Sequence, residues 1–381
     1  MERLVVCQGT AQLVTAVAAL REHAKRASTE SNGPPSRDHL LICGLAVSPG
    51  QIDEFALVIE RMAALVHSFA SVSRMGDRVL EQLINAAERG AGAREVADLL
   101  QKVTGVTKVG EVFTVRDWQA CNELALGAYP EATHICYGDS VGVYLPRGFM
   151  SPRRSPWSRV AARLRRWRQS KQDLLANPRV DINYLLLPGA FGMPPGGEVV
   201  RTQATTLRDL FGSLAPLLDG AALEGIRQKT AGRPVWVLLG SNFSEQGLMT
   251  PEAEASAYRD WIGSLHPEPG SVLLIKSHPR DHQSKRTLLE KQLLGLFDEV
   301  WCADAVGSAY LPVEVLLLEL ASVVGSLRCL TVSTACLGTR FVVESKTDIG
   351  LGDALVLKYM VPDRQEQRMQ HERDLRRLCA V

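Results

Sequence analysis

The sequence predicts a chain of two α/β domains, each a doubly wound parallel sheet with helices on both faces. Its 381 residues are too many for one ordinary core and suit two domains of about 150–200 residues each. Short apolar runs alternate with amphipathic stretches along the chain, as in parallel sheets covered by helices. The Gly- and Pro-rich segment Leu187–Gly197 interrupts this alternation. It is the predicted boundary, because neither a helix nor a central strand tolerates it.

The first half alternates strands with helices. The predicted strands are residues 4–7, 40–45, 68–72, 111–115, 133–137 and 184–187. The predicted helices are residues 11–25, 51–66, 78–87 and 93–104. Gly9 and Thr10 form the turn between the first strand and the first helix.

A second alternating series follows the boundary. The predicted strands are residues 235–239, 272–276, 299–302, 323–325, 330–332 and 341–343, and the predicted helices are residues 250–264, 285–296 and 313–320. The domains expected are residues 1–195, with a basic insertion at 147–171, and residues 231–362, joined by a linker and connecting helix over 196–230. The charged tail, residues 363–381, is predicted to be helical, and such a tail often returns to pack on the first domain.

Composition excludes several classes of protein. Hydrophobic residues make up 46% and charged residues 22% of the chain, which is typical of a soluble globular protein. The net charge of +1 argues against nucleic acid as the partner, and no apolar run of about 18 residues predicts a membrane span. The opening residues lack the pattern of a signal peptide, and eight single cysteines without a CxxC pair suit a reducing cytoplasm. A structural zinc site is not predicted.

Two doubly wound domains in tandem place their ligand cleft at the carboxyl ends of the strands. Asp139 follows the predicted strand 133–137 directly, after the flexible Gly138. A carboxylate there can take a proton from an attacking sugar hydroxyl. An Asp at this place also caps turns routinely, and position alone does not decide between the two roles.

His278 ends another predicted strand in the run Lys276-Ser277-His278-Pro279-Arg280. Pro279 cannot donate to a strand ladder, so the strand stops and His278 is predicted to turn into the cleft. An imidazole there can stabilise a leaving phosphate, helped by Lys276 or Arg280. The alternative is a surface histidine beside a basic turn, but His266-Pro267 shows that pair without a strand before it.

Three further segments of the second half carry polar residues at predicted strand ends or helix starts. Ser333-Thr334 could bind phosphate through hydroxyl and backbone N–H groups, or simply cap a helix. Glu314 opens a helix, where it could grip a ribose diol or only compensate the helix dipole. Gly240-Ser241-Asn242 follows a strand in a position where donors are commonly held, without the GxGxxG pattern of a dinucleotide site.

Taken in order, these motifs resemble the bacterial sialyltransferases and polysialyltransferases. Those families have two Rossmann-like domains facing across a cleft, the GT-B fold, and use a CMP-activated sialic acid without a metal. Their His-Pro motif is matched by His278-Pro279 and their Ser-Ser or Ser-Thr motif by Ser333-Thr334. Their acidic D/E-D/E-G motif corresponds to Asp139, although Gly138 stands where the first acid usually is and Ser140 where the Gly is.

The resemblance implies a single inverting displacement, with Asp139 and His278 facing each other across the cleft. Asp139 would take the proton of the acceptor, while His278 with Ser333 and Thr334 would stabilise the departing CMP. The implied donor site also includes Lys276, Pro279, Glu314, Gly240, Ser241 and Asn242, and the implied acceptor site includes Gly9, Thr10 and Gln12. One phosphate can be balanced by one His and hydroxyls, so no metal and no other cofactor is predicted.

The segment Arg147–Lys171 carries nine Arg or Lys and no acid, with Trp157 and Trp167 interleaved. It is typical of an interfacial helix on an anionic membrane, could equally bind a polyanionic glycan, or could be a solvated loop. The predicted protein is therefore cytoplasmic, with peripheral contact to the inner face of the membrane as one option. Two other functions stay open: a GT-B transferase with another CMP-acid or a UDP-sugar as donor, and a degenerate homologue that binds a nucleotide or glycan without turnover.

Overall fold

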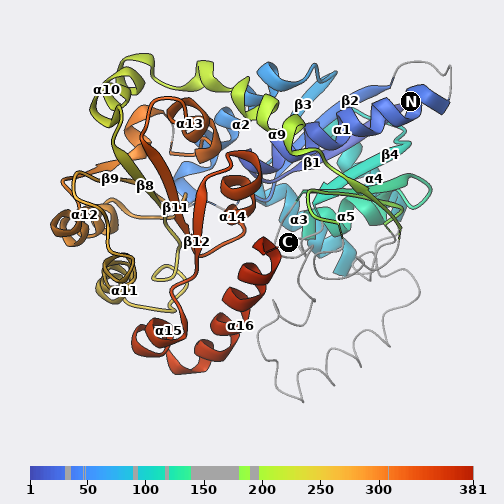
Figure 1. Cartoon of the computed structure of the whole chain (residues 1–381). Helices are drawn as coiled ribbons and strands as arrows, with labels where there is room; N and C mark the ends of the chain where they lie inside the picture. The colour runs from blue at the N-terminus through green and yellow to red at the C-terminus, as the bar shows by residue number, and fades with distance from the viewer. Residues whose placement is uncertain are drawn as a thin grey trace. The chain divides into compact units, whose positions relative to one another are not determined.

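The chain forms two compact units, each built on its own parallel sheet (Figure 1). The computed structural model describes residues 1–30, 36–45, 47, 49–88, 93–115, 120–138, 180–188, 197–307 and 309–380. The first unit comprises residues 1–46 and 52–203, and the second comprises residues 47–51 and 204–381. Within the described ranges, no helix has both the length and the apolar character needed to cross a membrane.

The first unit contains a seven-stranded sheet in the order β3-β2-β1-β4-β5-β6-β7, with every adjacent pair parallel. Its strands are β1 (Glu2–Cys7), β2 (Arg37–Cys43), β3 (Ser71–Met75), β4 (Glu111–Val115), β5 (Thr133–Tyr137), β6 (Ile182–Leu185) and β7 (Glu198–Arg201). The strand order reverses between β1 and β4, which is the switch point of this doubly wound sheet.

Helices cover both faces of the first sheet. They are α1 (Thr10–Glu30), α2 (Ile52–Val66), α3 (Asp77–Glu88), α4 (Ala93–Thr104) and α5 (Ala120–Ala128). Leu83, Leu100 and Leu124 on the last three helices pack on Leu4 and Val112 of the sheet. Because right-handed crossovers place α1 and α2 on the other face, both faces of the strands are buried and read as nearly continuous apolar runs.

The second unit repeats this plan with five parallel strands in the order β10-β9-β8-β11-β12. The strands are β8 (Pro234–Leu239), β9 (Val272–Lys276), β10 (Glu299–Cys302), β11 (Ser326–Thr331) and β12 (Lys346–Ile349). The order reverses between β8 and β11. The fold class predicted from the sequence, two doubly wound α/β sheets of Rossmann type, is therefore confirmed.

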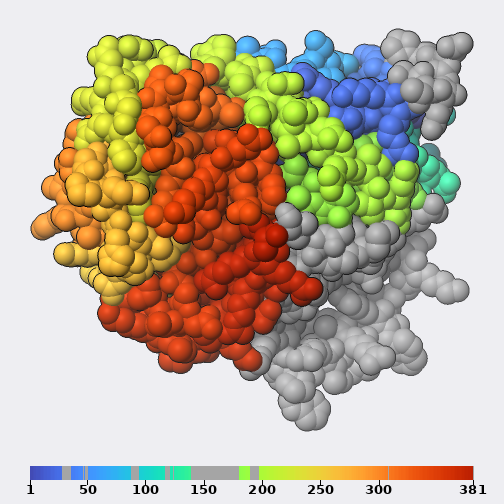
Figure 2. Space-filling view, in the orientation of Figure 1, coloured from blue at the N-terminus to red at the C-terminus, as the bar shows by residue number. Residues whose placement is uncertain are grey.

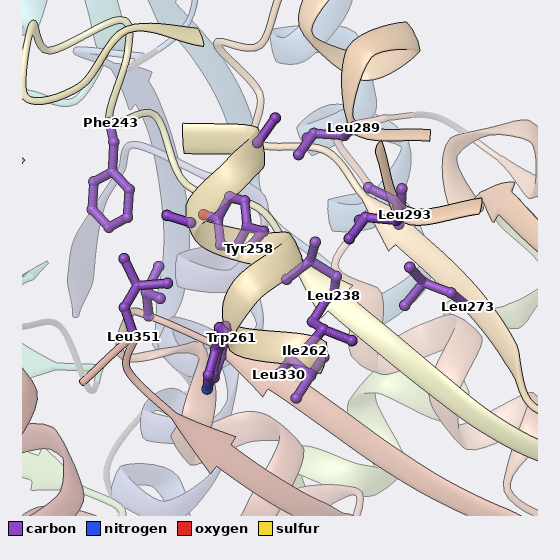
Figure 3. Close-up of a cluster of buried hydrophobic side chains, with 14 of the residues drawn as sticks. Leu238, Phe243, Tyr258, Trp261, Ile262, Leu273, Leu289, Leu293, Leu330 and Leu351 are labelled. Atoms are coloured by element: carbon purple, nitrogen blue, oxygen red, sulfur yellow. The ribbon is translucent and has the colours of Figure 1, made fainter. Parts of the chain in front are cut away.

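The helices of the second unit also lie on both faces. They are α9 (Ala204–Gly212), α10 (Gly220–Thr230), α11 (Pro251–Ser264), α12 (Gln283–Leu293), α13 (Val313–Leu320), α14 (Ala335–Leu337), α15 (Asp353–Tyr359) and α16 (Pro362–Cys379). One core lies under α11, α12 and α15, and another lies under α10 and α13. In the first of these, α11 carries Tyr258 and Trp261 between Phe243 and Leu351 on one side and Leu293 on the other (Figure 3).

The C-terminal helix α16 is part of the second unit and packs on α14, α15 and β12. Figure 2 shows its red surface joined to the surface of the neighbouring orange and red elements. A charged helical tail of this kind often returns to the first domain, as expected from the sequence, whereas these contacts place it on the second unit. Its buried residues are Glu372, Leu375, Leu378 and Cys379, and Arg368 and Glu372 also make the hydrogen bonds described below.

Several predicted elements were shifted or wrong. The strand predicted at 68–72 lies at Ser71–Met75, and the one predicted at 323–325 is a turn before β11. Residues 341–343 are not a strand, because Gly338–Val342 continues helically after α14 as a π-turn. A short apolar run fits a buried helix as well as a strand. The strands β7 and β12 were not predicted, since both are short, polar edge strands without an apolar run.

Candidate functional site

The predicted donor residues of the second unit follow three adjacent strands that end at the same level. Lys276 of β9 and Thr331 of β11 both pair in register with Leu239 of β8. His278 and Ser333 each lie two residues beyond this row. Since adjacent strands are about 4.8 Å apart, the two strand ends are separated by roughly 10 Å. The loops that follow them flank the switch point, where open parallel sheets bind their ligands.

His278 is held by the turn that it begins. Its backbone N–H donates to Asp281 Oδ2 at 2.9 Å, and its carbonyl accepts from Asp281 N–H at 2.9 Å. The ring atom Nδ1 accepts from Arg280 N–H at 3.1 Å. An Nδ1 that accepts a hydrogen bond carries no proton, so the neutral ring holds its proton on Nε2. His278 can therefore offer one oriented N–H to a ligand.

Burial, followed by the charges of Arg280 and Lys285, lowers the pKa of His278 to about 4. The imidazole is therefore neutral at pH 7. Of the two roles that the sequence left open, cation or hydrogen-bond donor, these surroundings favour the donor in the unliganded protein. A bound anion would raise this pKa again, because a nearby negative charge favours the protonated ring.

This depressed pKa predicts a pH dependence of stability. The folded protein binds the His278 proton only near pH 4, but the unfolded chain binds it near pH 6.5. The contribution of His278 to stability is therefore complete above pH 6.5 and is lost as the pH falls towards 4. His278→Gln should lose less stability than the wild type between pH 6.5 and 4 in urea unfolding.

The comparison with the wild type isolates His278, because the other shifted groups stay in the variant. Burial lowers the pKa of His371 to about 3, which acts in the same direction. Burial raises the pKa of Glu314, which acts in the opposite direction. Parallel pH curves for the variant and the wild type would show that His278 has an ordinary pKa.

A buried lysine joins the loop after β9 to the loop after β8. Lys285 Nζ donates to Asp281 Oδ1 at 2.9 Å and to the Ser241 carbonyl at 2.6 Å. It also lies 3.0 Å from carboxylate oxygens of both Glu245 and Glu254. Burial alone would lower the pKa of Lys285, but Glu254 and Asp281 outweigh it and raise that pKa. The Lys285 ammonium thus fixes Asp281, which holds the backbone of His278. It also fixes the loop after β8.

The predicted segment Gly240–Asn242 serves this arrangement mainly through its backbone. A β-carbon at Gly240 would lie 3.3 Å from the Lys276 carbonyl and 3.6 Å from His278 N, so the two loops run close together. Ser241 N–H donates to the Tyr258 hydroxyl at 3.1 Å. The Asn242 side-chain oxygen accepts from Gln246 at 2.6 Å, which closes the loop on itself.

Lys276 ends β9 as predicted, and its charge is paired inside the protein. Its ammonium donates to Asp304 Oδ1 at 2.7 Å and to the Ala309 carbonyl at 2.5 Å, and its side chain is 13% exposed. The charge is therefore paired within the protein and does not face a ligand phosphate as an unpaired cation. Sequence reasoning missed Asp304 as its partner, because Asp304 follows a different strand, β10.

Ser333 and Thr334 lie between β11 and α14. Ser333 Oγ lies 3.3 Å from Thr331 Oγ1 and accepts from Ala335 N–H at 3.4 Å, a long capping bond. Thr334 is the N-cap residue of α14, yet its hydroxyl makes no capping hydrogen bond to the described residues. Ordinary capping, the alternative weighed from the sequence, therefore does not account for Thr334.

Glu314 lies in the first turn of α13 and contacts the segment after Ser333-Thr334. A β-carbon at Gly338 would overlap the Glu314 carboxylate, so any larger residue there would require the Glu314 side chain to move. Glu314 is 8% exposed, and burial raises its pKa. A hollow opens beside the start of α13, and it is lined by Leu218, Lys276, Ala303, Gly307, Leu311, Pro312, Val313 and Leu316.

Asp139 lies outside the described residues, as do the basic segment 147–171 and residues 189–196 of the predicted boundary. The strand before Asp139 ends at Tyr137, as predicted. Gly138 has φ +85°, and a β-carbon there would lie 3.0 Å from Thr15 Oγ1. A side chain would be strained at this position.

The predicted acceptor residues follow β1, at the switch point of the first sheet. Gly9 provides the carbonyl that accepts from Leu13 N–H at 3.0 Å and so begins α1. The Gln12 side chain accepts from Gln8 N–H at 3.0 Å, and Thr10 is buried. The Gln12 side chain is thus engaged by the residue before the turn, and Gly9 and Gln12 are both half-buried.

The supporting residues were the part that sequence reasoning missed. Asp281, Lys285 and Glu254 come from a turn and two helices, and none carries a motif. Only their burial distinguishes them from surface charges. Their exposure of 5%, 3% and 1% shows that they form a polar layer beneath the loops. In a single sequence, no pattern distinguishes a charged helix residue that points into the protein from one that points to solvent.

Residues 142–325 match the family model for alpha-2,8-polysialyltransferase (POLYST). The match covers a little under half of the chain and includes His278-Pro279 and Glu314, while Asp139 and Ser333-Thr334 lie outside it. The resemblance to the polysialyltransferases is therefore confirmed over this segment, and it supports a glycosyltransferase as the class of enzyme. No curated protein matches the chain.

Several solved structures are similar to this chain at low sequence identity. Staphylococcus aureus MnaA with UDP has 11% identity and a TM-score of 0.47, covering 99% of this chain and 90% of that one. The UDP-GlcNAc 2-epimerase of Methanocaldococcus jannaschii, with UDP-GlcNAc and UDP, has 12% identity and a TM-score of 0.46, covering 97% and 91%. The GT-B domain of the Photobacterium damselae sialyltransferase has 12% identity and a TM-score of 0.39, covering 98% and 97%. Likeness at this level identifies no substrate.

Proposed function

We propose that this protein is an inverting glycosyltransferase that moves a sialic acid or related nonulosonic acid from a CMP-activated donor to a glycan acceptor. The observation that carries the proposal is the placement of His278 and Ser333 after strands that flank β8. His278 also lies in the segment that matches the polysialyltransferase model. The strands that carry this hydrogen-bond donor and these hydroxyl groups end roughly 10 Å apart, and we propose that their side chains extend towards one phosphate between the two loops.

The donor would bind along the carboxyl edge of the second sheet. Nε2–H of His278 would donate to a phosphate oxygen, and the hydroxyls of Ser333 and Thr334 would approach the same group. The nucleoside would lie over the start of α13, with Glu314 next to the ribose. Lys276 would contribute as one wall of the hollow beside α13, because its charge is paired with Asp304.

The proposed reaction is one displacement at the anomeric carbon of the donor sugar. An acceptor hydroxyl oxygen forms the new bond, its proton goes to Asp139, and the bond to the CMP oxygen breaks with inversion. The negative charge that develops on the leaving phosphate is stabilised by the Nε2–H of His278. We propose that this step needs no metal ion.

The acceptor would be a glycan that enters beside Gly9 in the first unit. The segment Arg147–Lys171 would add a basic surface for an anionic acceptor or an anionic membrane. Nucleic acid is not proposed as a partner, since the net charge is only +1.

Cytidine monophosphate should raise the apparent melting temperature of the protein in a thermal-shift assay. A ligand that binds only the folded state stabilises it by about 2.7 kcal/mol at a hundredfold excess over its dissociation constant. EDTA should leave the CMP effect unchanged. CMP-sialic acid with a sialylated oligosaccharide should then give a longer product in a transfer assay.

The two competing functions predict different results in the same assays. Stronger protection by UDP than by CMP would favour a UDP-sugar donor. Protection by CMP without transfer to any of a panel of glycan acceptors would favour a protein that binds the nucleotide without turnover. If EDTA abolished the stabilisation by CMP, the proposal that no metal is needed would be wrong, while the proposed donor would stand.

A further inference from the structure

Three charged residues on one face of α16 meet the carboxyl ends of β11 and β12. Glu372 is 0% exposed and accepts from Arg368 Nε at 2.9 Å and from Arg376 Nη2 at 3.0 Å. Each arginine also donates to a backbone carbonyl at or just past a strand end. Arg368 reaches Val332 O at 2.7 Å, and Arg376 reaches Ile349 O at 2.8 Å.

The two arginines bind backbone carbonyls that precede different segments. Val332 stands directly before Ser333 and Thr334, whereas Ile349 stands before a turn that carries none of the proposed site residues. Arg368 also stacks on the Phe243 ring, with its guanidinium carbon 4.7 Å from the ring centroid. Phe243 follows the segment Gly240–Asn242. One guanidinium thus joins α16 to both loops at the switch point of the sheet.

Stability alone is a weak reason for this arrangement. Arg368 has a side chain only 10% exposed, and a buried ion pair often stabilises no better than apolar residues of the same volume. A guanidinium adds geometric specificity, because its planar group donates to several acceptors in fixed directions at once. At Arg368 the acceptors so fixed are the strand end and Glu372.

We infer that Arg368 is a positioning residue for the donor site, which holds the turn of Ser333 and Thr334 in the geometry that receives the donor phosphate. The inference rests on the proposed function, but only in its last step. An experiment without ligand can show whether Arg368 orders this turn. A binding experiment with a nucleotide then shows whether this order matters for the donor site.

The matched variants are Arg368→Met and Arg376→Met in the full chain. Each removes one arginine from the same carboxylate and one bond to a carbonyl after a strand. Hydrogen exchange in the unliganded protein should speed up in R368M at the amides of Cys336 and Leu337, which bond to Ser333 and Thr334 carbonyls. In R376M the faster exchange should fall around Gly350 and Gly352 instead.

The second readout is the dissociation constant for CMP by calorimetry, with UDP and UMP measured beside it. R368M should bind the nucleotide preferred by the wild type about tenfold more weakly, the loss of one hydrogen bond from a charged group. R376M should stay within about threefold of the wild type. A folded R368M that binds as tightly as the wild type overturns the inference and leaves the proposed function standing.

A wild type that binds none of these nucleotides overturns the proposed function, and the donor-site role of Arg368 with it. Arg368→Lys covers the case in which R368M does not fold. Lysine keeps the charge but is a single point donor, so it cannot serve Val332 O and Glu372 in the same fork geometry. R368K should therefore be folded and bind the nucleotide more weakly than the wild type, and unchanged binding again overturns the inference.

Discussion

Replacing His278 with alanine is expected to lower the rate of sugar transfer by about 10²–10³-fold, the usual cost of removing one preorganised donor from a developing negative charge. The fold should survive, because the backbone N–H of His278 keeps its bond to Asp281 and the Lys285 network is untouched. The measurements are kcat and KM with CMP-sialic acid, together with the melting temperature. The loss should appear mainly in kcat, since the charge develops in the transition state.

His266-Pro267 provides the matched control. It is the same dipeptide on the surface of the same unit, after a helix instead of a strand, and His266 has φ +49°. His266→Asn suits that backbone, because Asn tolerates the left-handed region. H266N should transfer sugar at the wild-type rate. Near-normal transfer by H278A would return His278 to the role of a surface histidine beside a basic turn.

Asp139→Asn is expected to lower transfer by about 10²–10⁴-fold, the range for loss of a general base. Asparagine keeps the shape of the side chain but cannot accept a proton at neutral pH. The nucleotide affinity should not change, because the proposed donor site lies on the second sheet. Single-turnover transfer and CMP calorimetry on the same preparation measure both quantities.

Glu131→Gln is the control for Asp139. Glu131 is an exposed carboxylate just before β5, at the opposite end of the same strand, so E131Q removes the same kind of group from outside the site. It should behave as the wild type. Transfer by D139N at more than about a tenth of the wild-type rate is more than loss of a base allows. Asp139 would then be a turn residue, and another carboxylate of the first domain would be the base.

The fold was largely predictable because parallel strands buried on both faces leave a strong pattern. The strands β4, β5 and β9 were predicted with the bounds that the structure shows, since each is a buried, largely apolar run inside a sheet. The edge strands β7 and β12 lack that pattern. In β12, Asp348 is held by Arg328 of the neighbouring strand at 2.6 Å, a contact that no local signal predicts.

The site was predictable only in part, for a related reason. The rule that ligands bind at strand ends placed His278 and Ser333 correctly after β9 and β11. What each charged group pairs with depends on which strands lie side by side. Lys276 was therefore assigned to a phosphate although Asp304 neutralises it. Lys285 and Arg368 were missed, because an inward-facing charge on a helix looks like a surface charge in the sequence.

The docking of α16 also bears on the order in which the protein is made. Every strand of the second sheet precedes α16 in the chain, so the ribosome synthesises the helix after the elements that it fixes. Domains fold as they emerge, at about 5–20 residues per second. Arg368 is therefore synthesised about one to four seconds after Ile349, the last residue of β12. A chain interrupted between β12 and α16 would keep both Rossmann-like sheets and all the motif residues, yet the turn of Ser333 and Thr334 would lack its anchor.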